Sequence, residues 1–184
     1  MATFARITAL LLAALLAGHA DARATSVTDE DYPRALEGDA AVAVSWTDPA
    51  EFSEIRNSRN RWEARRGDWV RQLAEHLREE ASARLAPGER LEVVITDIER
   101  AGDYEPAAGR GQDIRIIREI YPPRLSLRYT RIVGNGKVMD EGERKLVDMG
   151  FMTSGAGRLD SDPLRYEKRL IDDWVRRDLR APGA

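Results

Sequence analysis

"LRYTRIVGNGKVMDEGER", residues 127–144, contains the clearest turn signal in the chain. Asn135-Gly136 at its centre is typical of two-residue β-hairpin turns, because both residue types tolerate a positive φ. The turn predicts a hairpin with strands over 125–129 and 137–148. The cross-strand pairs expected from this register are Arg128 with Glu143, Arg131 with Asp140, Tyr129 with Gly142, Ile132 with Met139, and Val133 with Val138.

Arginines are crowded around the first strand of this hairpin, and two explanations are open. A basic face that binds an anion is one, and the other is a set of ion pairs between strands. Opposite charges that face each other across a sheet stabilise it by about 0.2–1 kcal/mol per pair. The expected register places an acid opposite both Arg128 and Arg131. We therefore interpret these arginines as partners of cross-strand ion pairs.

The apolar periodicity on either side of the hairpin predicts the remaining elements. Alternation predicts strands over 41–46, 91–95 and 114–120, and spacings of three and four residues predict a helix over 59–85. Gly67 interrupts this helix, which favours a start with Asp68 as N-cap. A second helix is expected after Asp162-Pro163, with Tyr166, Leu170 and Trp174 on one face.

These elements follow the order β-α-β-β-β-β-α, which is typical of an α+β domain. We expect a mostly antiparallel sheet with two helices packed on one face. If the strands over 41–46 and 91–95 are neighbours, the helix between them makes the pair parallel, with a right-handed crossover.

The amino-terminal residues have the three parts of a secretory signal peptide. A start with one charge, at Arg6, precedes the apolar run 9–17, and small residues allow cleavage before Asp21 or Thr25. The run is too short to span a bilayer, which needs about 20 apolar residues. We expect residues 1–24 to be removed on export to the periplasm, 25–40 to form a flexible acidic leader, and 41–184 to form one domain.

Composition restricts the classes of partner and cofactor. The chain has no cysteine, which excludes disulfides, thiolate metal sites and the thioether anchor of a lipoprotein. Its formal net charge of −3 argues against a nucleic-acid binder, which needs a basic surface. We expect no cofactor and no membrane-embedded segment. The expected partner is an unidentified envelope protein or a small ligand.

The acidic stretch "VVITDIERAGDYEP", residues 93–106, is the candidate most suggestive of chemistry. Its acids Asp97, Glu99, Asp103 and Glu105 could form a cation site, a catalytic carboxylate pair or a polar turn. Their spacing does not fit the twelve-residue calcium loop, and an Asp that ends a strand commonly accepts backbone N–H bonds. We favour Asp97 as an anchor of the loop. Asp97, Glu99 and Asp103 are retained only as a weak metal candidate, and no catalytic residue is assigned.

A histidine and an apolar loop are two further candidates for a site. His76 lies in the middle of the first helix without a glycine-flanked serine or another obvious nucleophile in the sequence, so we interpret it as structural. Met149, Phe151 and Met152 lie in a glycine-rich loop and are candidates for a partner-binding surface. The alternative for Phe151 is packing against the sheet.

Five segments resemble an uncharacterised family of secreted proteobacterial proteins, the domain-of-unknown-function family 3016. They are "VAVSWTDPAEFSEIR", "LEVVITDIERAG", "DIRIIREIYPPRLSLRY", "LVDMGFM" and "LRYEKRLIDDWV", which together span 42–175. The resemblance implies export and a single domain, and it supplies no activity and no catalytic residue. We expect a soluble, non-enzymatic binding or interaction module of the bacterial cell envelope. The alternative is a hydrolase, cation-assisted or carboxylate-based, that uses the Asp97/Asp103 region.

Overall fold

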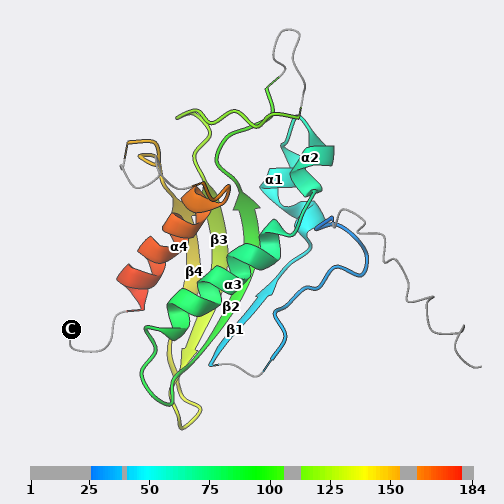
Figure 1. Cartoon of the computed structure of the whole chain (residues 1–184). Coiled ribbons are helices and arrows are strands. Elements are labelled where there is room, and N and C mark those ends of the chain that lie inside the picture. Colours follow the sequence, from blue (N-terminus) through cyan, green and yellow to red (C-terminus); the bar gives the residue numbers. More distant parts are fainter. Residues whose placement is uncertain (1–25, 39–40, 106–112, 154–160, 180–184) are drawn as a thin grey trace, which may run out of the picture.

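The computed structural model describes residues 26–38, 41–105, 113–153 and 161–179. Four strands form one mixed sheet, in the order β1-β2-β3-β4, and helices α3 and α4 pack against it (Figure 1). The elements are β1 (Val42–Trp46), the 3-10 turn η1 (Pro49–Glu51), α1 (Ser53–Arg56), α2 (Arg61–Arg65), α3 (Trp69–Ser82), β2 (Arg90–Glu99), β3 (Arg124–Ile132), β4 (Val138–Val147) and α4 (Arg165–Asp178). The fold is therefore α+β, as expected.

The core lies between one face of the sheet and the two long helices, which lie side by side over it in Figure 1. β1 and β2 are parallel, and the other two strand pairs are antiparallel, as the connections predict. Every second residue of β1, β2 and β3 is buried over most of each strand, so one face is apolar and the other polar. Trp174 of α4 is fully buried, and its ring meets that of Tyr129 edge-on at 5.8 Å between centroids.

The hairpin forms with the expected register over most of its length. Arg128 faces Glu143, Tyr129 faces Gly142 and Arg131 faces Asp140. The register shifts after Arg131, so that Ile132 pairs with Val138 and the two pairings predicted nearest the turn are wrong. An extra residue on one strand of an antiparallel pair is a β-bulge, which the apolar pattern alone does not reveal.

The predicted ion pairs across the hairpin are not the ones that form. Arg131 is buried and bonds Glu89, in the turn before β2, with 2.7 Å between Nη2 and Oε2. Among the described residues, no ion pair joins the facing side chains of Arg128 and Glu143, which are both exposed. The register was right, but the Arg131 side chain reaches the core side of the sheet, where Glu89 is its partner.

The strand predicted over 114–120 does not exist. One isolated bridge, between Ile116 and Asp103, is the only β pairing in this part of the described chain, so the sheet has four strands and not five. Ile114 and Ile120 are exposed. The apolar alternation was misleading because the guanidinium of Arg115, on this segment, bonds backbone carbonyls of 100–102 and draws the segment against that loop.

Gly67 divides the predicted helix over 59–85 into α2 and α3. Its φ of +85° lies in the left-handed region, which favours glycine and ends the helical run. Asp68 then occupies the N-cap position of α3, as expected, although its carboxylate accepts the Tyr32 hydroxyl at 2.6 Å and caps no helix N–H. The apolar spacing over 59–85 includes Trp62 and predicts it on the buried face of the helix, but in α2 this side chain is exposed.

Residues 26–38 are packed against the domain, so the expectation of a flexible leader is wrong for them. Val27 and Tyr32 are buried in the common core, and the Leu36 N–H bonds the Val44 carbonyl along the outer edge of β1. The prediction failed because it relied on the acidic average composition of the segment, which does not reveal that Val27 and Tyr32 are buried. The predicted signal peptide 1–24, Thr25 and residues 39–40 lie outside the described residues.

Candidate functional site

A cavity of about 360 Å³ opens where α1, the end of β2 and the segment leading into β3 meet. Its lining is mostly polar and charged. The charged residues that line it are Glu54, Glu99, Arg100, Asp103, Arg115 and Arg124. Two of the three acids retained as a metal candidate, Glu99 and Asp103, are therefore in this lining, and Asp97 bonds Ser53, which is also in it.

Asp97 fastens α1 to the end of β2. A bulge in β2 between Ile95 and Asp97 breaks the alternation, so that Ile98 is the next buried residue after Ile95. The Asp97 carboxylate accepts the Ser53 backbone N–H at 2.6 Å and the Ser53 hydroxyl at 2.7 Å. One of the unpaired N–H groups at the start of a helix is thus satisfied. Asp97 therefore holds the start of a distant helix, and the prediction that it anchors the loop after its own strand is wrong.

Glu54, on α1, is a buried acid in the lining of the cavity. Its carboxylate accepts the backbone N–H of Arg100 at 2.9 Å and a guanidinium N–H of the same residue at 2.8 Å. The Arg115 guanidinium also contacts this carboxylate. A carboxylate with 3% of its side chain exposed needs such partners, because burial of an unpaired charge costs several kcal/mol. Sequence reasoning overlooked Glu54.

Arg115 also shapes the loop beneath the cavity. Its Nη1 donates to the carbonyl oxygens of residues 100, 101 and 102, at 3.3, 3.2 and 2.8 Å. Gly102 in this loop has a φ of +81°, and a Cβ there would lie 2.6 Å from the Ile116 carbonyl oxygen. No other residue type fits this close approach without a shift of the backbone.

The acids at the rim of the cavity are paired with basic side chains. Asp103 accepts from Arg59 at 2.9 Å, and Glu99 pairs with Arg124 at 3.2 Å. Burial raises the pKa of the Glu99 carboxyl, and the positive charge of Arg124 opposes this effect. Glu105, the fourth acid of the stretch, accepts the Tyr121 hydroxyl at 3.0 Å. Asp97, Glu99 and Asp103 do not converge as one set of metal ligands.

A second buried acid that the sequence reasoning missed contacts Ala101, the chain neighbour of two lining residues. Glu167 of α4 is 2% exposed, and it accepts the Ala101 N–H at 2.6 Å through Oε1. Its other oxygen has no hydrogen-bond partner within the described part of the chain. Burial raises the pKa of Glu167, against the opposing effects of backbone hydrogen bonds and of Arg100 and Arg115. Its spacing from Leu170 and Trp174 places it on the apolar face of α4, which was a readable signal.

The arrangement is suited to holding a molecule by hydrogen bonds. No histidine lines the cavity, and the Ser53 hydroxyl is bonded to Asp97, so a nucleophile activated by an imidazole is absent from this lining. The ion pairs fix the positions of the charged walls before any ligand arrives. Such pre-formed walls reduce the entropy lost on binding.

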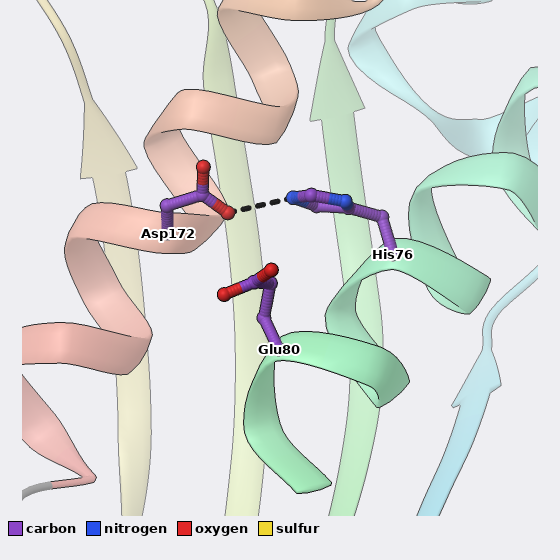
Figure 2. A group of neighbouring side chains, drawn as sticks. All are labelled: His76, Glu80 and Asp172. Atoms are coloured by element: carbon purple, nitrogen blue, oxygen red, sulfur yellow. Dashed lines mark hydrogen bonds and ion pairs between the residues drawn. The ribbon is translucent and has the colours of Figure 1, made fainter. Parts of the chain in front are cut away.

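His76 lies elsewhere, on the side of α3 that faces α4. Its Nε2 is 2.6 Å from Oδ1 of Asp172, and Glu80 lies one helical turn further along α3 (Figure 2). Within the described ranges, these three residues are the only group of potential metal ligands whose donor atoms all lie within 4.8 Å of one another. The spacing of His76 and Glu80 was readable in the sequence, and the approach of Asp172 was not.

The three apolar loop residues suggested as a partner surface differ in exposure. Phe151 is 1% exposed and meets the Tyr166 ring edge-on at 4.9 Å, so it is part of the interior, as the alternative interpretation held. Met149 and Met152 are exposed. Their role as a binding surface remains a prediction.

Comparison with known proteins identifies the family of this chain but assigns it no activity. Within the described ranges, no helix has both the length and the apolar character needed to cross a membrane. No curated protein and no solved structure matches the chain. Residues 40–177 match the family described as "Protein of unknown function (DUF3016)", and this match covers most of the chain, including β1, the cavity lining and all but the last residue of α4. The chain therefore belongs to the DUF3016 family.

Proposed function

We propose that this protein is a non-enzymatic binding module of the bacterial cell envelope and that a small polar molecule binds in the cavity between α1 and the end of β2. The observation that carries the proposal is a cavity of about 360 Å³ whose charged lining residues form ion pairs with one another. Small-molecule sites are commonly concave, largely pre-formed and about 300–1,000 Å³ in volume. Most such sites are apolar, so a polar lining selects a polar ligand.

The balance of charge points to a ligand without net charge. Three acids and three arginines line the cavity, and these acids are engaged in ion pairs. A strongly charged ligand would have to break one of these pairs and leave a partner uncompensated, which is costly in a partly buried site. A neutral molecule rich in hydroxyl or amide groups can bond to Asn57, Ser58 and Tyr121 of the lining while the pairs stay intact.

The periplasmic setting rests on the amino-terminal sequence. The short apolar run after Arg6 and the small residues that follow support export with cleavage, and the lack of cysteine supports a protein without a lipid anchor. We infer that the module meets its ligand in the periplasm. An envelope protein that contacts Met149 and Met152 is the alternative partner.

A carboxylate-based hydrolase is the second candidate, and one observation favours it. Glu99 lies in the cavity with a raised pKa, caused by its burial, and perturbed carboxyl groups are common in active sites. The residues first suspected for this role are less suitable. Asp97 is bonded to Ser53, and Asp103 is bonded to Arg59.

Heteronuclear NMR on the isotope-labelled protein tests the proposal, with neutral mono- and disaccharides as probes and inorganic phosphate and acetate as charged comparisons. We expect the saccharides to shift the amide signals of residues around the cavity, and Tyr121→Phe and Asn57→Ala to weaken binding several-fold. Glu141→Gln, an exposed change on β4, is the matched control and should bind normally.

Three results would contradict the binding module. One is the absence of shifts around the cavity with every neutral probe, and another is a stronger response to phosphate than to saccharides. The third is cleavage of a probe that disappears in Glu99→Gln, which would establish the hydrolase instead.

A further inference from the structure

We propose that His76, Glu80 and Asp172 bind a divalent first-row transition metal ion that bridges α3 and α4. The three side chains come from two helices that are far apart in the sequence and adjacent in space, and Figure 2 shows them directed toward one another. Their donor atoms all lie within 4.8 Å of one another. The site is separate from the cavity, so it does not depend on the proposed binding function.

The helices hold the three positions in place. Residues four apart on a helix lie one above the other on the same side, so His76 and Glu80 face α4 together. Leu77 of α3 and Ile171 of α4, each the sequence neighbour of a proposed ligand, are fully buried. The backbone beneath the site is therefore fixed by the core, while the donor atoms stay at a half-buried margin. A hydrated ion can enter there and keep water as its remaining ligands.

The neighbouring cations do not neutralise the site. Lys168 lies one turn before Asp172 on α4, but its ammonium group is held by Asp162 at 2.5 Å. Arg176, one turn after Asp172, pairs with Asp173. In the part of the chain that the structure describes, no hydrogen bond or ion pair is found for the Glu80 carboxylate. Asp172 therefore has His76 as its partner. The Glu80 carboxylate, which forms no bond of its own among the described residues, is directed toward these two side chains (Figure 2).

The donor set selects the class of ion. One imidazole nitrogen and two carboxylate oxygens suit Zn²⁺ and related divalent transition metals, whereas Mg²⁺ prefers oxygen ligands alone. Donors at about 2.0–2.2 Å from a Zn²⁺ ion lie roughly 3–3.5 Å from each other. His76 and Asp172, now 2.6 Å apart, need to separate slightly, and Glu80 needs to approach. Side-chain rotations on fixed helices are sufficient. The two carboxylates also carry the negative charge that a divalent ion balances.

The test uses the full chain without a polyhistidine tag, stripped with a chelator and dialysed against Zn²⁺. We expect one Zn²⁺ per chain, displacement of the His76 ring signals in NMR, and a rise in the melting midpoint with Zn²⁺ that Mg²⁺ does not reproduce. His76→Gln, Glu80→Gln and Asp172→Asn should each weaken Zn²⁺ binding by at least tenfold. Glu79→Gln, the same chemical change one position before Glu80 on an exposed site, is the matched control and should bind as the unchanged protein does.

Circular dichroism of each variant shows whether it is folded, and the ring signals of His76 report on the site without reference to stability. Zn²⁺ binding that is unchanged in folded His76→Gln and Asp172→Asn overturns the proposal. The proposal is also overturned if the protein binds no Zn²⁺ at tens of micromolar. The three side chains would then serve only to join α3 and α4, through the contact between His76 and Asp172.

Discussion

Glu167 illustrates at the scale of one residue how a buried acid is tolerated. It lies on the apolar face of α4 beside Leu170, with one oxygen bonded to the Ala101 N–H and the other without a hydrogen-bond partner in the described chain. Burial of an ionised carboxylate is costly, so the neutral form is favoured and the pKa is raised. Glu167 accepts a hydrogen bond from the loop at Ala101. Because its pKa is raised in the folded chain, it also makes the stability of the fold depend on pH.

Glu167→Gln should make the protein progressively more stable than the unchanged chain as the pH rises above about 4.5, the pKa of an unperturbed Glu. Above this pH the unfolded chain releases the proton while the folded chain keeps it, so Glu167 destabilises the fold as pH increases. Glutamine keeps the acceptor for Ala101 and has no proton to lose. One such group contributes a slope of at most about 1.4 kcal/mol per pH unit. Urea unfolding from pH 4 to 8 measures the difference.

The matched control for this measurement is Glu141→Gln, which removes an exposed acid on β4. It should leave the pH profile almost unchanged, because this side chain is exposed and stays in contact with water when the chain folds. Parallel profiles for Glu167→Gln and the unchanged protein would show that Glu167 is ionised in the fold.

Helix α4 packs against α3 and against strands β3 and β4, and so completes the cover of the core. Its buried residues recur every three or four positions, which is the spacing of one helical face: Glu167, Leu170, Ile171, Trp174 and Val175. Tyr166 was expected on this face, but it lies at its edge, where its ring meets Phe151. The helix starts at Arg165, and Asp162 bonds the Leu164 N–H at 2.8 Å just before it. α4 is held mainly by its apolar contacts.

Trp174→Ala should therefore lower the free energy of unfolding by roughly 3–5 kcal/mol, the usual cost of a large-to-small change in a core. The indole is fully buried and packs on Tyr129 of β3, so its loss leaves a cavity between helix and sheet. Denaturant unfolding followed by circular dichroism gives the value. Arg177→Ala, on the exposed side of the same helix, is the control and should change little. An unchanged midpoint in Trp174→Ala would mean that α4 is not docked through this face.

At the scale of the whole molecule, the domain is completed by the segment before β1. Residues 34–36 bond along the outer edge of β1, through the Leu36 N–H to Val44 and the Trp46 N–H to Arg34. Tyr32 donates to Asp68 and accepts the Arg71 N–H, which ties the same segment to the start of α3. One exposed sheet edge is covered in this way, and an uncovered edge promotes association between chains.

Deletion of residues 26–38 should consequently destabilise the fold by several kcal/mol and promote aggregation. Full burial of one apolar side chain stabilises a fold by about 1.5–3 kcal/mol, and the segment buries both Val27 and Tyr32. Urea unfolding and light scattering of the truncated protein measure the two effects. Glu30→Gln, an exposed change within the segment, should have neither effect. A truncated protein with an unchanged midpoint would restore the view of this segment as a loose leader.

Sequence alone was sufficient for the features that depend on local backbone geometry and on regular spacing. The hairpin around Asn135-Gly136, the helix break at Gly67 and the buried face of α4 each follow from a few neighbouring residues. The hairpin loop itself spans three residues, 134–136, and not the two predicted, and of Asn135 and Gly136 only Gly136 has a positive φ. The parallel pairing of β1 with β2 followed from the helix between them.

The tertiary structure decided everything that depends on which surfaces meet. The apolar alternation of 114–120 is the same in a strand and in a loop. In the structure this segment is held against residues 100–103 by the Arg115 hydrogen bonds and by one isolated bridge between Ile116 and Asp103. The pairing of Glu54 with Arg100, and that of His76 with Asp172, joins residues separated by 46 and 96 positions. No local pattern encodes such contacts, because charged side chains select their partners by the burial and distance that the folded core imposes.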